Sequence, residues 1–474
     1  MTVRRLGRQL MAARHNILLL TDSYKVSHHR QYPPGTERVY SYFESRGGDF
    51  PQTVFFGLQY LLQEYLAGQV VTPRKIDEAE RLLARHFRDE SIFYRAGWEY
   101  LCRKHGGRLP VRIKAVAEGS VVPTSNVLLT IENTDPNCYW LTNYLETLLV
   151  QVWYPSTVAT QSRAMKQILA DFLRETGDPE LLPFKLHDFG FRGVSSVETA
   201  AIGGAAHLVN FLGTDNLAGV VHAQTYYGAE MPGYSIPAAE HSTLTSWGAE
   251  HEADAFRNML VQFPTGPVAV VSDSYDVFRA CEQIWGRELK PDVLKRQGTL
   301  VVRPDSGDPP AVVVRVLDIL GQAFGSSTNS KEYRVLDPHV RVIQGDAIDR
   351  DMLQRILEAM RTSGWSADNV SFGSGGGLLQ KLNRDTCRFA FKCSAVTING
   401  QERDVFKRPV TDPDKRSKAG RLKLVRRGRD FVTLADAPDN LEPDLLQDVF
   451  INGELTTTVS WNDIRGRAAL DMNP

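Results

Sequence analysis

The sequence predicts an α/β protein, an irregular β/α barrel joined to a second, mixed α+β domain built from both chain ends. In the second half, short β-branched runs alternate with helix-like segments, whereas the two ends of the chain lack that repeat. Hydrophobic residues make up 42% of the chain and charged residues 23%, which is ordinary globular composition. The 474 residues allow two or three domains with a sizeable core.

Four strands of the barrel are expected where a β-branched run ends in a polar loop. Buried runs that alternate with amphipathic helices are typical of a parallel sheet, and a repeat of roughly 30 to 40 residues suits a β/α barrel. An open doubly wound sheet is the alternative, and it also gathers the ends of its strands at one edge. The runs span residues 268–271, 300–302, 340–343 and 370–372.

The two chain ends are expected to form the second domain. Strands are predicted at 38–43 and 111–115 and helices at 76–87 and 139–152, and a turn is predicted at Asp412-Pro413-Asp414. We therefore expect residues 16–150 and 386–474 to form the mixed α+β domain and residues 151–385 to form the barrel-like domain. Residues 1–15 hold four arginines and no acid, and we expect a disordered extension rather than a transit peptide.

Composition also limits the class of protein. The formal net charge is -1, so the chain shows no general affinity for polyanions, and any phosphate binding must be local. The five cysteines are odd in number and form no C-x-x-C pair, so neither a disulfide framework nor a structural zinc site is expected. This cysteine pattern fits a reducing, cytoplasmic setting. No apolar run approaches the roughly 20 residues of a membrane helix, so no membrane partner is expected.

A glycine-rich loop, Gly373-Ser374-Gly375-Gly376-Gly377, follows the last predicted strand. Free backbone N–H groups at the start of a helix bind phosphate well. The loop does not match a dinucleotide fingerprint, because position 378 is Leu378 and not glycine. A tight turn that needs positive φ is the other interpretation.

Three aspartates, Asp273, Asp305 and Asp346, each follow a predicted strand. Carboxylate oxygens at such positions suit Mg²⁺ that is bound mainly through substrate phosphates, with Asp305 as the candidate ligand. Helix capping explains a single aspartate equally well. Three of them at equivalent positions, with Arg303 beside one, favour a site.

His241 lies in a segment rich in proline, glycine and small residues, 232–243, that precedes a helix-like stretch. A neutral imidazole can act as a nucleophile or a proton carrier near pH 7. Taken alone, this histidine is more simply interpreted as a structural, hydrogen-bonded one. The Lys/Arg-rich stretch 403–429 is likewise open to three interpretations: a solvated face, a phosphate-binding surface or a nucleic-acid surface.

Several longer motifs, in order along the chain, resemble the nicotinamide phosphoribosyltransferases of the type II phosphoribosyltransferase family. The resemblance covers the chain from about Asn16 to near its C-terminus. It rests on Thr21-Asp22-Ser23-Tyr24-Lys25, on His187-Asp188-Phe189-Gly190-Phe191-Arg192-Gly193, on Gly213-Thr214-Asp215, on the His241 segment, on Arg303-Pro304-Asp305-Ser306-Gly307, on Gln344-Gly345-Asp346 and on Gly373 to Lys381.

The resemblance implies transfer of the phosphoribosyl group of phosphoribosyl pyrophosphate to nicotinamide, giving nicotinamide mononucleotide and pyrophosphate in NAD salvage. It implies Mg²⁺ as cofactor, ATP as a coupled co-substrate, and a homodimer whose active sites are shared between subunits. No nucleic-acid partner is expected.

The resemblance also implies roles for individual residues. Phe189 would stack on one face of the pyridine ring, and Tyr24 from the second subunit would cover the other. Asp215 would accept a hydrogen bond from the carboxamide, with Arg192 beside the amide and the pyrophosphate. Ribose and phosphate would be held by Arg303, Asp305, Gly345, Asp346, Gly375 and Gly376, and further positive charge would come from Arg46, Arg384, Lys392 and Lys407. His241, supported by Asp273, would be phosphorylated by ATP, and with Asp305 these two form the expected catalytic set.

The chain departs from the family pattern at two alanines. The family usually has serine where this chain has Ala269, near the carboxamide, and often has serine where it has Ala390, near the phosphates. Loss of one hydrogen bond costs about 0.5–1.5 kcal/mol, so we expect weaker affinity without loss of activity. The loop around 47–50 is also shorter than in animal forms.

Two further functions stay open from the sequence. One is a nicotinate phosphoribosyltransferase; the other is a non-catalytic binding protein on the same fold. A carboxylate at Asp215 argues against nicotinate, because two like charges at about 4 Å and a dielectric near 20 repel by roughly 4 kcal/mol. Retention of His241, Arg303 and Asp305 argues against a non-catalytic protein.

Overall fold

The computed structural model describes residues 15–411, 416–428, 430–435 and 442–471. The chain divides into two compact units. The parallel unit comprises Gln161–Thr225, Ala229–Leu382 and Ala469–Pro474, and the antiparallel unit comprises Met1–Thr160, Tyr226–Gly228 and Asn383–Ala468. The predicted extension, apart from His15, and the predicted turn at Asp412-Pro413-Asp414 lie outside the described residues.

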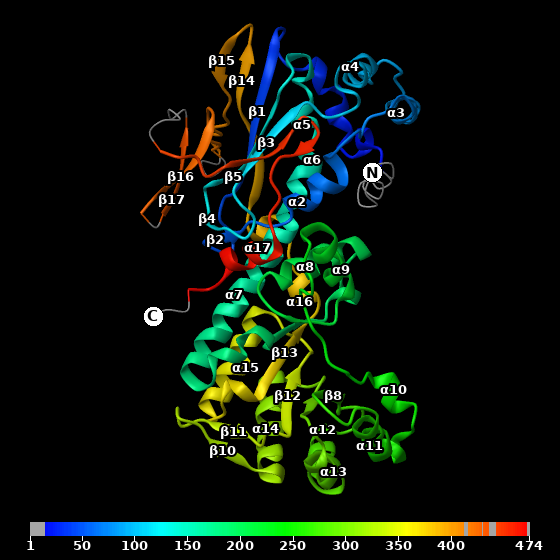
Figure 1. The fold of residues 1–474 in the computed structure, drawn as a ribbon, viewed down its shortest axis with the longest axis vertical. Coiled ribbons are helices and arrows are strands. Elements are labelled where there is room, and N and C mark those ends of the chain that lie inside the picture. The colour runs from blue at the N-terminus through cyan, green and yellow to red at the C-terminus, as the bar shows by residue number, and fades with distance from the viewer. Residues whose placement is uncertain (1–14, 412–415, 429, 436–441, 472–474) are drawn as a thin grey trace. The chain divides into compact units, whose positions relative to one another are not determined.

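The parallel unit is built on a six-stranded parallel sheet, in the order β7-β6-β13-β12-β9-β8, that forms a half-barrel (Figure 1). This confirms the predicted mixed α/β fold, and the four predicted strands lie at the expected positions. All four residues of β8 are buried, as expected for a strand covered on both faces. The bounds are β6 Leu186–Asp188, β7 Gly213–Thr214, β8 Val268–Val271, β9 Leu300–Arg303, β12 Val340–Gln344 and β13 Val370–Ser374.

The two edges of this sheet are joined by a segment of irregular chain, 234–238. Tyr234 forms a parallel bridge with Gly213 of β7, and Ala238 forms one with Ala269 of β8. Tyr234 N donates to Leu212 O at 2.7 Å, and Ala269 N donates to Pro237 O at 2.9 Å. The segment therefore occupies the gap between the first and last strands, which accounts for the irregularity of the barrel.

Amphipathic helices cover the outside of the half-barrel. Helix α15, Arg350–Thr362, begins where the Asp349 side chain accepts a hydrogen bond from Met352 N at 3.0 Å. It buries Leu353, Ile356, Leu357 and Met360, a one-sided spacing that faces the sheet. The other helices are α7 Trp153–Thr176, which contains the division between the units, α8 Val197–Leu208, α9 Leu217–Tyr227, α10 His241–Thr245, α11 Glu252–Gln262, α12 Val277–Arg279 continued by the π-helix Ala280–Glu288, α13 Lys290–Lys295, α14 Pro309–Phe324 and α16 Gly376–Leu379. A small hairpin, β10 Ser326–Thr328 and β11 Arg334–Leu336, completes the unit.

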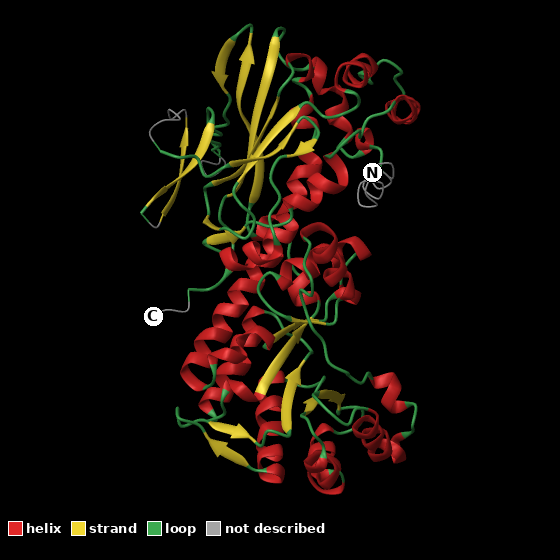
Figure 2. Ribbon diagram, in the orientation of Figure 1, coloured by secondary structure: helices red, strands yellow, loops and turns green. Residues whose placement is uncertain are grey.

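The antiparallel unit contains a seven-stranded sheet in the order β15-β14-β1-β5-β3-β18-β19 (Figure 2). Its central pair is β1 with β14, whose register places Glu44 opposite Ala390 and Tyr42 opposite Lys392. The bounds are β1 Thr36–Ser45, β3 Val111–Ala115, β5 Val127–Asn133, β14 Phe389–Ile398, β15 Gln401–Asp404, β18 Gln447–Ile451 and β19 Glu454–Leu455, with two small pairs, β2 Gln52–Val54 with β4 Val121–Pro123 and β16 Leu422–Arg427 with β17 Asp430–Ala435.

Helices of the antiparallel unit follow the sequence only in part. The predicted helix at 76–87 is present as α3, Pro73–Phe87, capped by Thr72. The stretch predicted as a helix at 139–152 is helical but broken, because the chain forms α5 Leu141–Tyr144, α6 Glu146–Leu149 and the 3₁₀ helix Val150–Val152 in succession. The other α-helices among the described residues of this unit are α2 Leu58–Leu61, continued by the π-helix Leu62–Leu66, α4 Arg95–His105 and α17 Trp461–Ala468. No helix in the described part of the chain is both long enough and apolar enough to cross a bilayer.

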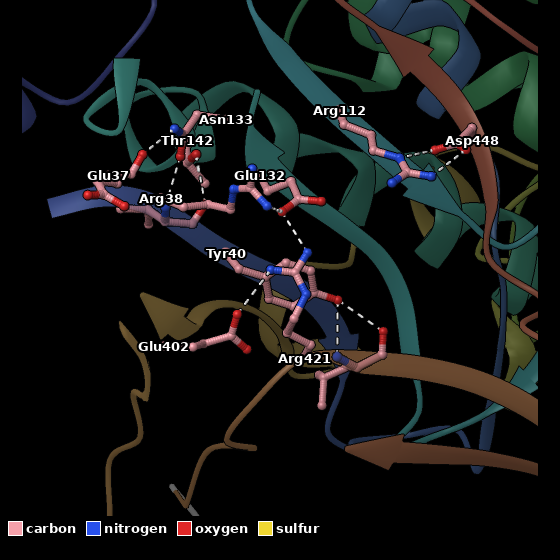
Figure 3. Close-up of polar contacts among 12 residues, drawn as sticks. Glu37, Arg38, Tyr40, Arg112, Glu132, Asn133, Thr142, Glu402, Arg421 and Asp448 are labelled. Atoms are coloured by element: carbon pink, nitrogen blue, oxygen red, sulfur yellow. Dashed lines mark hydrogen bonds and ion pairs between the residues drawn. The ribbon is translucent and has the colours of Figure 1, made fainter. Parts of the chain in front are cut away.

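Arg421, just before β16, contacts side chains of the seven-stranded sheet (Figure 3). Arg421 Nη2 donates to Glu132 Oε2 at 2.6 Å, and its Nη1 lies 3.8 Å from Glu402 Oε2. The guanidinium also lies over the Tyr40 ring, 4.7 Å from its centroid. Glu132 lies on β5, Glu402 lies on β15 and Arg421 immediately precedes β16, so these contacts join the start of β16 to both of those strands.

Candidate functional site

The carboxyl ends of the six parallel strands carry most of the predicted site residues. Asp273 follows β8; Arg303 ends β9 and Asp305 follows it; Gly345 and Asp346 follow β12. Gly375 and Gly376 follow β13, Phe189 follows β6 and Asp215 follows β7. Parallel strands bring all of these positions to one edge of the sheet, as the alternation of strands and helices predicts.

His241 is the first residue of α10 and pairs with Asp273. His241 Nε2 lies 2.9 Å from Asp273 Oδ1. The imidazole side chain is 42% exposed, whereas the aspartate side chain is 5% exposed. The short helix that carries the histidine is fixed by a capping box between Glu240 and Thr243. A buried carboxylate thus orients an imidazole that remains accessible.

Arg303 and Asp305 form the polar centre of the edge. Arg303 Nη2 donates to Asp305 Oδ2 at 3.3 Å, and Arg303 Nε is buried without a partner among the described atoms. Burial raises the pKa of Asp305; Arg303 and His241 oppose that rise, and the Asp273 and Asp346 carboxylates add to it. The three predicted aspartates therefore lie within electrostatic range of one another, together with one guanidinium and one imidazole.

Phe189 packs inside the half-barrel. Its ring lies against the cluster of Ala269, Val301 and Ile343. A Cβ atom on Gly373 would lie 1.9 Å from Phe189 Cε2, so only glycine leaves room for the ring at that position. Phe189 N donates to Ser374 O at 2.9 Å, which fixes the backbone of Phe189 beside the end of β13. The result is a flat aromatic surface at the carboxyl edge.

Asp215 is exposed and is held by the segment that joins the sheet edges. Ser235 Oγ donates to Asp215 Oδ1, and Asp215 N donates to Asp188 O at 3.0 Å. Arg192 follows Phe189 by three residues and is 85% exposed, with its Nη2 3.9 Å from Glu240 Oε2. The carboxylate is therefore anchored, whereas the guanidinium is free to meet a ligand.

The glycine loop serves two purposes. A Cβ atom on Gly377 would lie 2.4 Å from Ile348 O, so this glycine is required by packing. A Cβ atom on Gly376 would meet nothing within 4 Å, and that position faces open space. The helix that follows, α16, has only four residues. The loop thus exposes backbone at Gly375 and Gly376 without being a long helix terminus.

Sequence reasoning missed the buried polar residues that support this edge. Asp188 ends β6 and is fully buried, and its carboxylate accepts hydrogen bonds from Gly190 N at 2.6 Å and Asn216 Nδ2 at 2.9 Å. Ser235 and Glu240, which are exposed, were likewise not predicted. Their only signal is position, since each neighbours a predicted site residue or its motif in the sequence.

A strongly basic cavity of about 1000 Å³ lies within the antiparallel unit. It brings together four predicted residues. The Lys392 side chain is half-buried, and burial lowers its pKa, as do the charges of Arg46, Arg384 and Lys407, while Glu146 opposes that change. The lining comprises Glu44, Arg46, Ser125, Arg384, Asp385, Arg388, Phe389, Ala390, Lys392, Lys407, Arg416 and Lys418. Part of the basic stretch 403–429 is therefore folded into a cavity suited to an anion.

Glu44 is a buried acid among these bases and was not predicted. Arg46 Nε donates to Glu44 Oε1 at 2.9 Å, and Lys418 Nζ pairs with Glu44 Oε2. Arg46 Nη2 is buried and has no partner among the described atoms. The carboxylate therefore fixes one side of the guanidinium and leaves the other side available.

Tyr24 lies elsewhere in the antiparallel unit, on the 3₁₀ helix Ser23–Arg30, and is 60% exposed. Its ring contacts that of His28, with centroids 5.1 Å apart. It does not line the basic cavity.

All five cysteines are free. Three side chains, His105, Asp135 and Cys138, place possible metal-ligand atoms within 4.8 Å of one another. In the structure this last group is a hydrogen-bonded cap, with His105 Nε2 2.7 Å from Asp135 Oδ2.

Known families match most of the chain. The model of the nicotinate phosphoribosyltransferase (NAPRTase) family matches residues 184–454, and the model of the nicotinamide phosphoribosyltransferase N-terminal domain matches residues 16–113. The chain is 53% identical over 465 residues to a nicotinamide phosphoribosyltransferase of Xanthomonas campestris pv. campestris, covering 96% of this chain and 98% of that protein. It is 34% identical over 500 residues to a nicotinamide phosphoribosyltransferase of Acinetobacter baylyi, covering 98% and 99%.

Solved structures are similar in fold. A nicotinate-nucleotide pyrophosphorylase from Pyrococcus furiosus matches with a TM-score of 0.59 at 14% identity, covering 96% of this chain and 95% of that one. The human nicotinic acid phosphoribosyltransferase matches with a TM-score of 0.56 at 18% identity, covering 95% and 93%. At these identities the likeness shows the fold alone.

Proposed function

The chain belongs to the nicotinamide phosphoribosyltransferase family, a family of pentosyltransferases, and from this premise we propose that it transfers the phosphoribosyl group of phosphoribosyl pyrophosphate to nicotinamide, in NAD salvage. The observation that carries the proposal is the pairing of the Phe189 ring, packed over Gly373, with the anchored carboxylate of Asp215 on the adjacent strand end. An aromatic surface beside a hydrogen-bond acceptor suits a pyridine ring that bears an amide NH₂.

The transfer itself needs no proton. The pyridine nitrogen attacks ribose C1′, the bond from C1′ to the pyrophosphate oxygen breaks, and pyrophosphate leaves with the electron pair. Phe189 orients the ring, and Asp215 sets its rotation by accepting from the amide. Arg192 and Arg303 stabilise the charge that develops on the leaving group, and the partnerless Nε of Arg303 is available to such an anion.

The carboxylates at the edge fit a magnesium ion bound largely through substrate phosphates. Hard oxygen donors are what this ion prefers, and Asp305, with Asp273 and Asp346 nearby, supplies them. Asp305 is the residue that would hold the ion. When bound, Mg²⁺ would neutralise charge on the pyrophosphate.

ATP coupling is assigned to His241. The hydrogen bond from Nε2 to Asp273 selects the tautomer with the proton on Nε2, which leaves the Nδ1 lone pair as the nucleophile. Nδ1 attacks the γ-phosphorus of ATP, the bond to the β-phosphate oxygen breaks, and ADP leaves. Water then hydrolyses the phosphohistidine to phosphate. The exposure of the imidazole supports this role.

The basic cavity is proposed to hold phosphate groups, through Arg46, Arg384, Lys392 and Lys407. Tyr24 is proposed to cover the pyridine ring from the second subunit of a homodimer, which its exposure permits. The Tyr24 assignment makes the active site a shared one.

The test is product analysis with purified protein, Mg²⁺ and phosphoribosyl pyrophosphate, with nicotinamide and nicotinate side by side and with ATP present or absent. We expect nicotinamide mononucleotide and pyrophosphate, with a higher yield when ATP is present. Because Asp215 is exposed, water screens its repulsion of nicotinate, and we expect about tenfold or greater preference for the amide rather than the roughly thousandfold that about 4 kcal/mol would give. A preference for nicotinate would overturn the role of Asp215, and absence of both products would overturn the proposal.

A further inference from the structure

Asp188 and Asn216 are the two most deeply buried polar side chains at the carboxyl ends of β6 and β7. Asp188 is fully buried and Asn216 is 1% exposed. Asp188 immediately precedes Phe189, and Asn216 immediately follows Asp215. A hydrogen bond of 2.9 Å joins Asn216 Nδ2 to Asp188 Oδ2. This hydrogen bond therefore connects the loop that carries Phe189 to the loop that carries Asp215, at the residue next to each of them.

Every polar atom of this pair has a structural partner. Asp188 Oδ1 accepts from Gly190 N at 2.6 Å, which fixes the turn that follows Phe189. Asn216 Nδ2 also donates to Ala200 O of α8 at 2.9 Å, and Asn216 Oδ1 accepts from Gly219 N of α9 at 3.3 Å. The pair therefore joins two strand ends and two helices at one point.

We propose that Asp188 and Asn216 are positioning residues for the pyridine substrate: their buried hydrogen bond sets the spacing between the Phe189 ring and the Asp215 carboxylate, and with it the choice of amide over acid. This rests on the proposed function, because it concerns how that site recognises its substrate. A ring held by stacking and an amide held by one acceptor tolerate little change in the distance between the two groups.

The chemistry of the buried pair favours a specific role. Burial raises the pKa of Asp188 to about 6, the hydrogen bonds from Gly190 and Asn216 oppose that rise, and Asp215 adds to it. A simple packing residue at this place would be apolar, because a buried carboxylate carries a desolvation cost. The carboxylate instead accepts one donor from each of the two loops, an arrangement that an apolar side chain cannot provide.

The test compares Asp188→Asn with the parent enzyme. The substituted amide keeps an acceptor for Gly190 N but turns a donor toward the Asn216 donor, so the two loops separate. We expect KM for nicotinamide to rise about tenfold or more, KM for phosphoribosyl pyrophosphate to stay within about twofold, and the preference for nicotinamide over nicotinate to fall. Calorimetric binding of nicotinamide alone should weaken by the same factor.

Two further variants keep the test decisive. Asn216→Ser removes the bond to Asp188 while its hydroxyl can still accept from Gly219 N, so it should fold if Asp188→Asn does not, with a smaller shift in the same KM. Asn369→Asp is the matched control: Asn369 is fully buried in the same unit, donates to Arg334 O and Ser366 O, and accepts from Leu336 N, away from the carboxyl edge. It should lower thermal stability without changing KM for nicotinamide.

The outcomes separate the two proposals. A parent enzyme that makes no nicotinamide mononucleotide overturns the proposed function. If the parent enzyme turns over normally, the proposed function stands. The positioning role is then overturned if the variants at positions 188 and 216 change KM equally for both substrates, or if they leave the preference for nicotinamide over nicotinate unchanged. The positioning role is also overturned if Asn369→Asp shifts KM for nicotinamide as much as Asp188→Asn.

Discussion

His241 Nε2 lies 2.9 Å from Asp273 Oδ1, and the two side chains differ sharply in exposure: the imidazole is 42% exposed and the carboxylate 5%. The acid is therefore placed to hold the ring, and the ring is placed to meet a ligand. Such an imidazole presents one nitrogen lone pair in a defined direction.

Replacing His241 with alanine is expected to abolish ATP hydrolysis while leaving basal formation of nicotinamide mononucleotide detectable, since the transfer step that we propose does not use the imidazole. Asp273→Asn should lower ATP hydrolysis by about tenfold to a thousandfold, because the ring loses its fixed tautomer while keeping a hydrogen-bond partner. Phosphate release and product yield, measured in parallel, check both variants. Unchanged ATP hydrolysis in the alanine variant would contradict the assignment.

Gly373→Ala is expected to displace the Phe189 ring, because the added methyl would lie 1.9 Å from its Cε2 atom. KM for nicotinamide should rise by about tenfold, a loss of roughly 1.4 kcal/mol of binding. Gly466→Ala in α17 is the control, since a methyl group there meets nothing within 4 Å. Initial rates at varied nicotinamide measure the effect, and equal KM values for the two variants would argue against Phe189 as the stacking surface.

Glu44→Gln is expected to weaken binding of phosphoribosyl pyrophosphate and to lower stability. The change leaves Arg46 and Lys418 without the buried carboxylate between them, and breaking a buried ion pair costs about 3 kcal/mol or more. Glu99→Gln, which removes one partner of exposed Arg95, should lower stability much less, because water screens an exposed ion pair.

Urea unfolding measures stability in the two variants, and KM for phosphoribosyl pyrophosphate measures the cavity. A lower KM for phosphoribosyl pyrophosphate in Glu44→Gln would contradict this prediction. It would mean that the Glu44 carboxylate repels the substrate phosphates rather than holding Arg46 in place.

The raised pKa of Asp188 predicts a pH dependence of stability. The folded group titrates near 6 and the unfolded group near 3.8, so the folded state binds the proton more tightly. Its contribution is fully present below the unfolded pKa and is lost as the pH rises through about 6, up to about 3 kcal/mol. The free energy of unfolding of the parent, relative to Asp188→Asn, should fall between about pH 4 and pH 6.5 and be nearly constant above that. A constant difference across that range would contradict the shift.

The strands of the parallel sheet were predictable because their runs are continuous and buried. Val268–Val271 matches β8 residue for residue, and the polar residues after each strand gather at one edge as expected. Neither the helical break at 141–152 nor the bridging segment 234–238 could be predicted. Both arise from tertiary packing and leave no periodic pattern in the sequence.

Part of the candidate site was predictable from position and from the family resemblance: Asp273 follows a predicted strand, whereas His241 and Arg303 were singled out by the motifs that contain them. Asp188, Asn216 and Glu44 could not be found in this way. Each acts through buried hydrogen bonds to groups far away in the sequence or on another element, such as Glu44 with Lys418. The sequence shows which side chains are present but not which of them lose contact with water.

The chain between the two sheet edges has a fixed length. Ser235, near its start, holds Asp215, and His241 begins the helix just after its end. Tyr234 forms a bridge to Gly213 of β7 at one edge of the sheet, and Ala238 forms a bridge to Ala269 of β8 at the other. Removing one residue would shorten this span by about 3.3–3.6 Å, more than a hydrogen bond can absorb. The proposed pyridine site and the proposed phosphohistidine are thus held at a fixed separation along one backbone segment, and we expect deletion of a single residue from 234–238 to displace at least one of them.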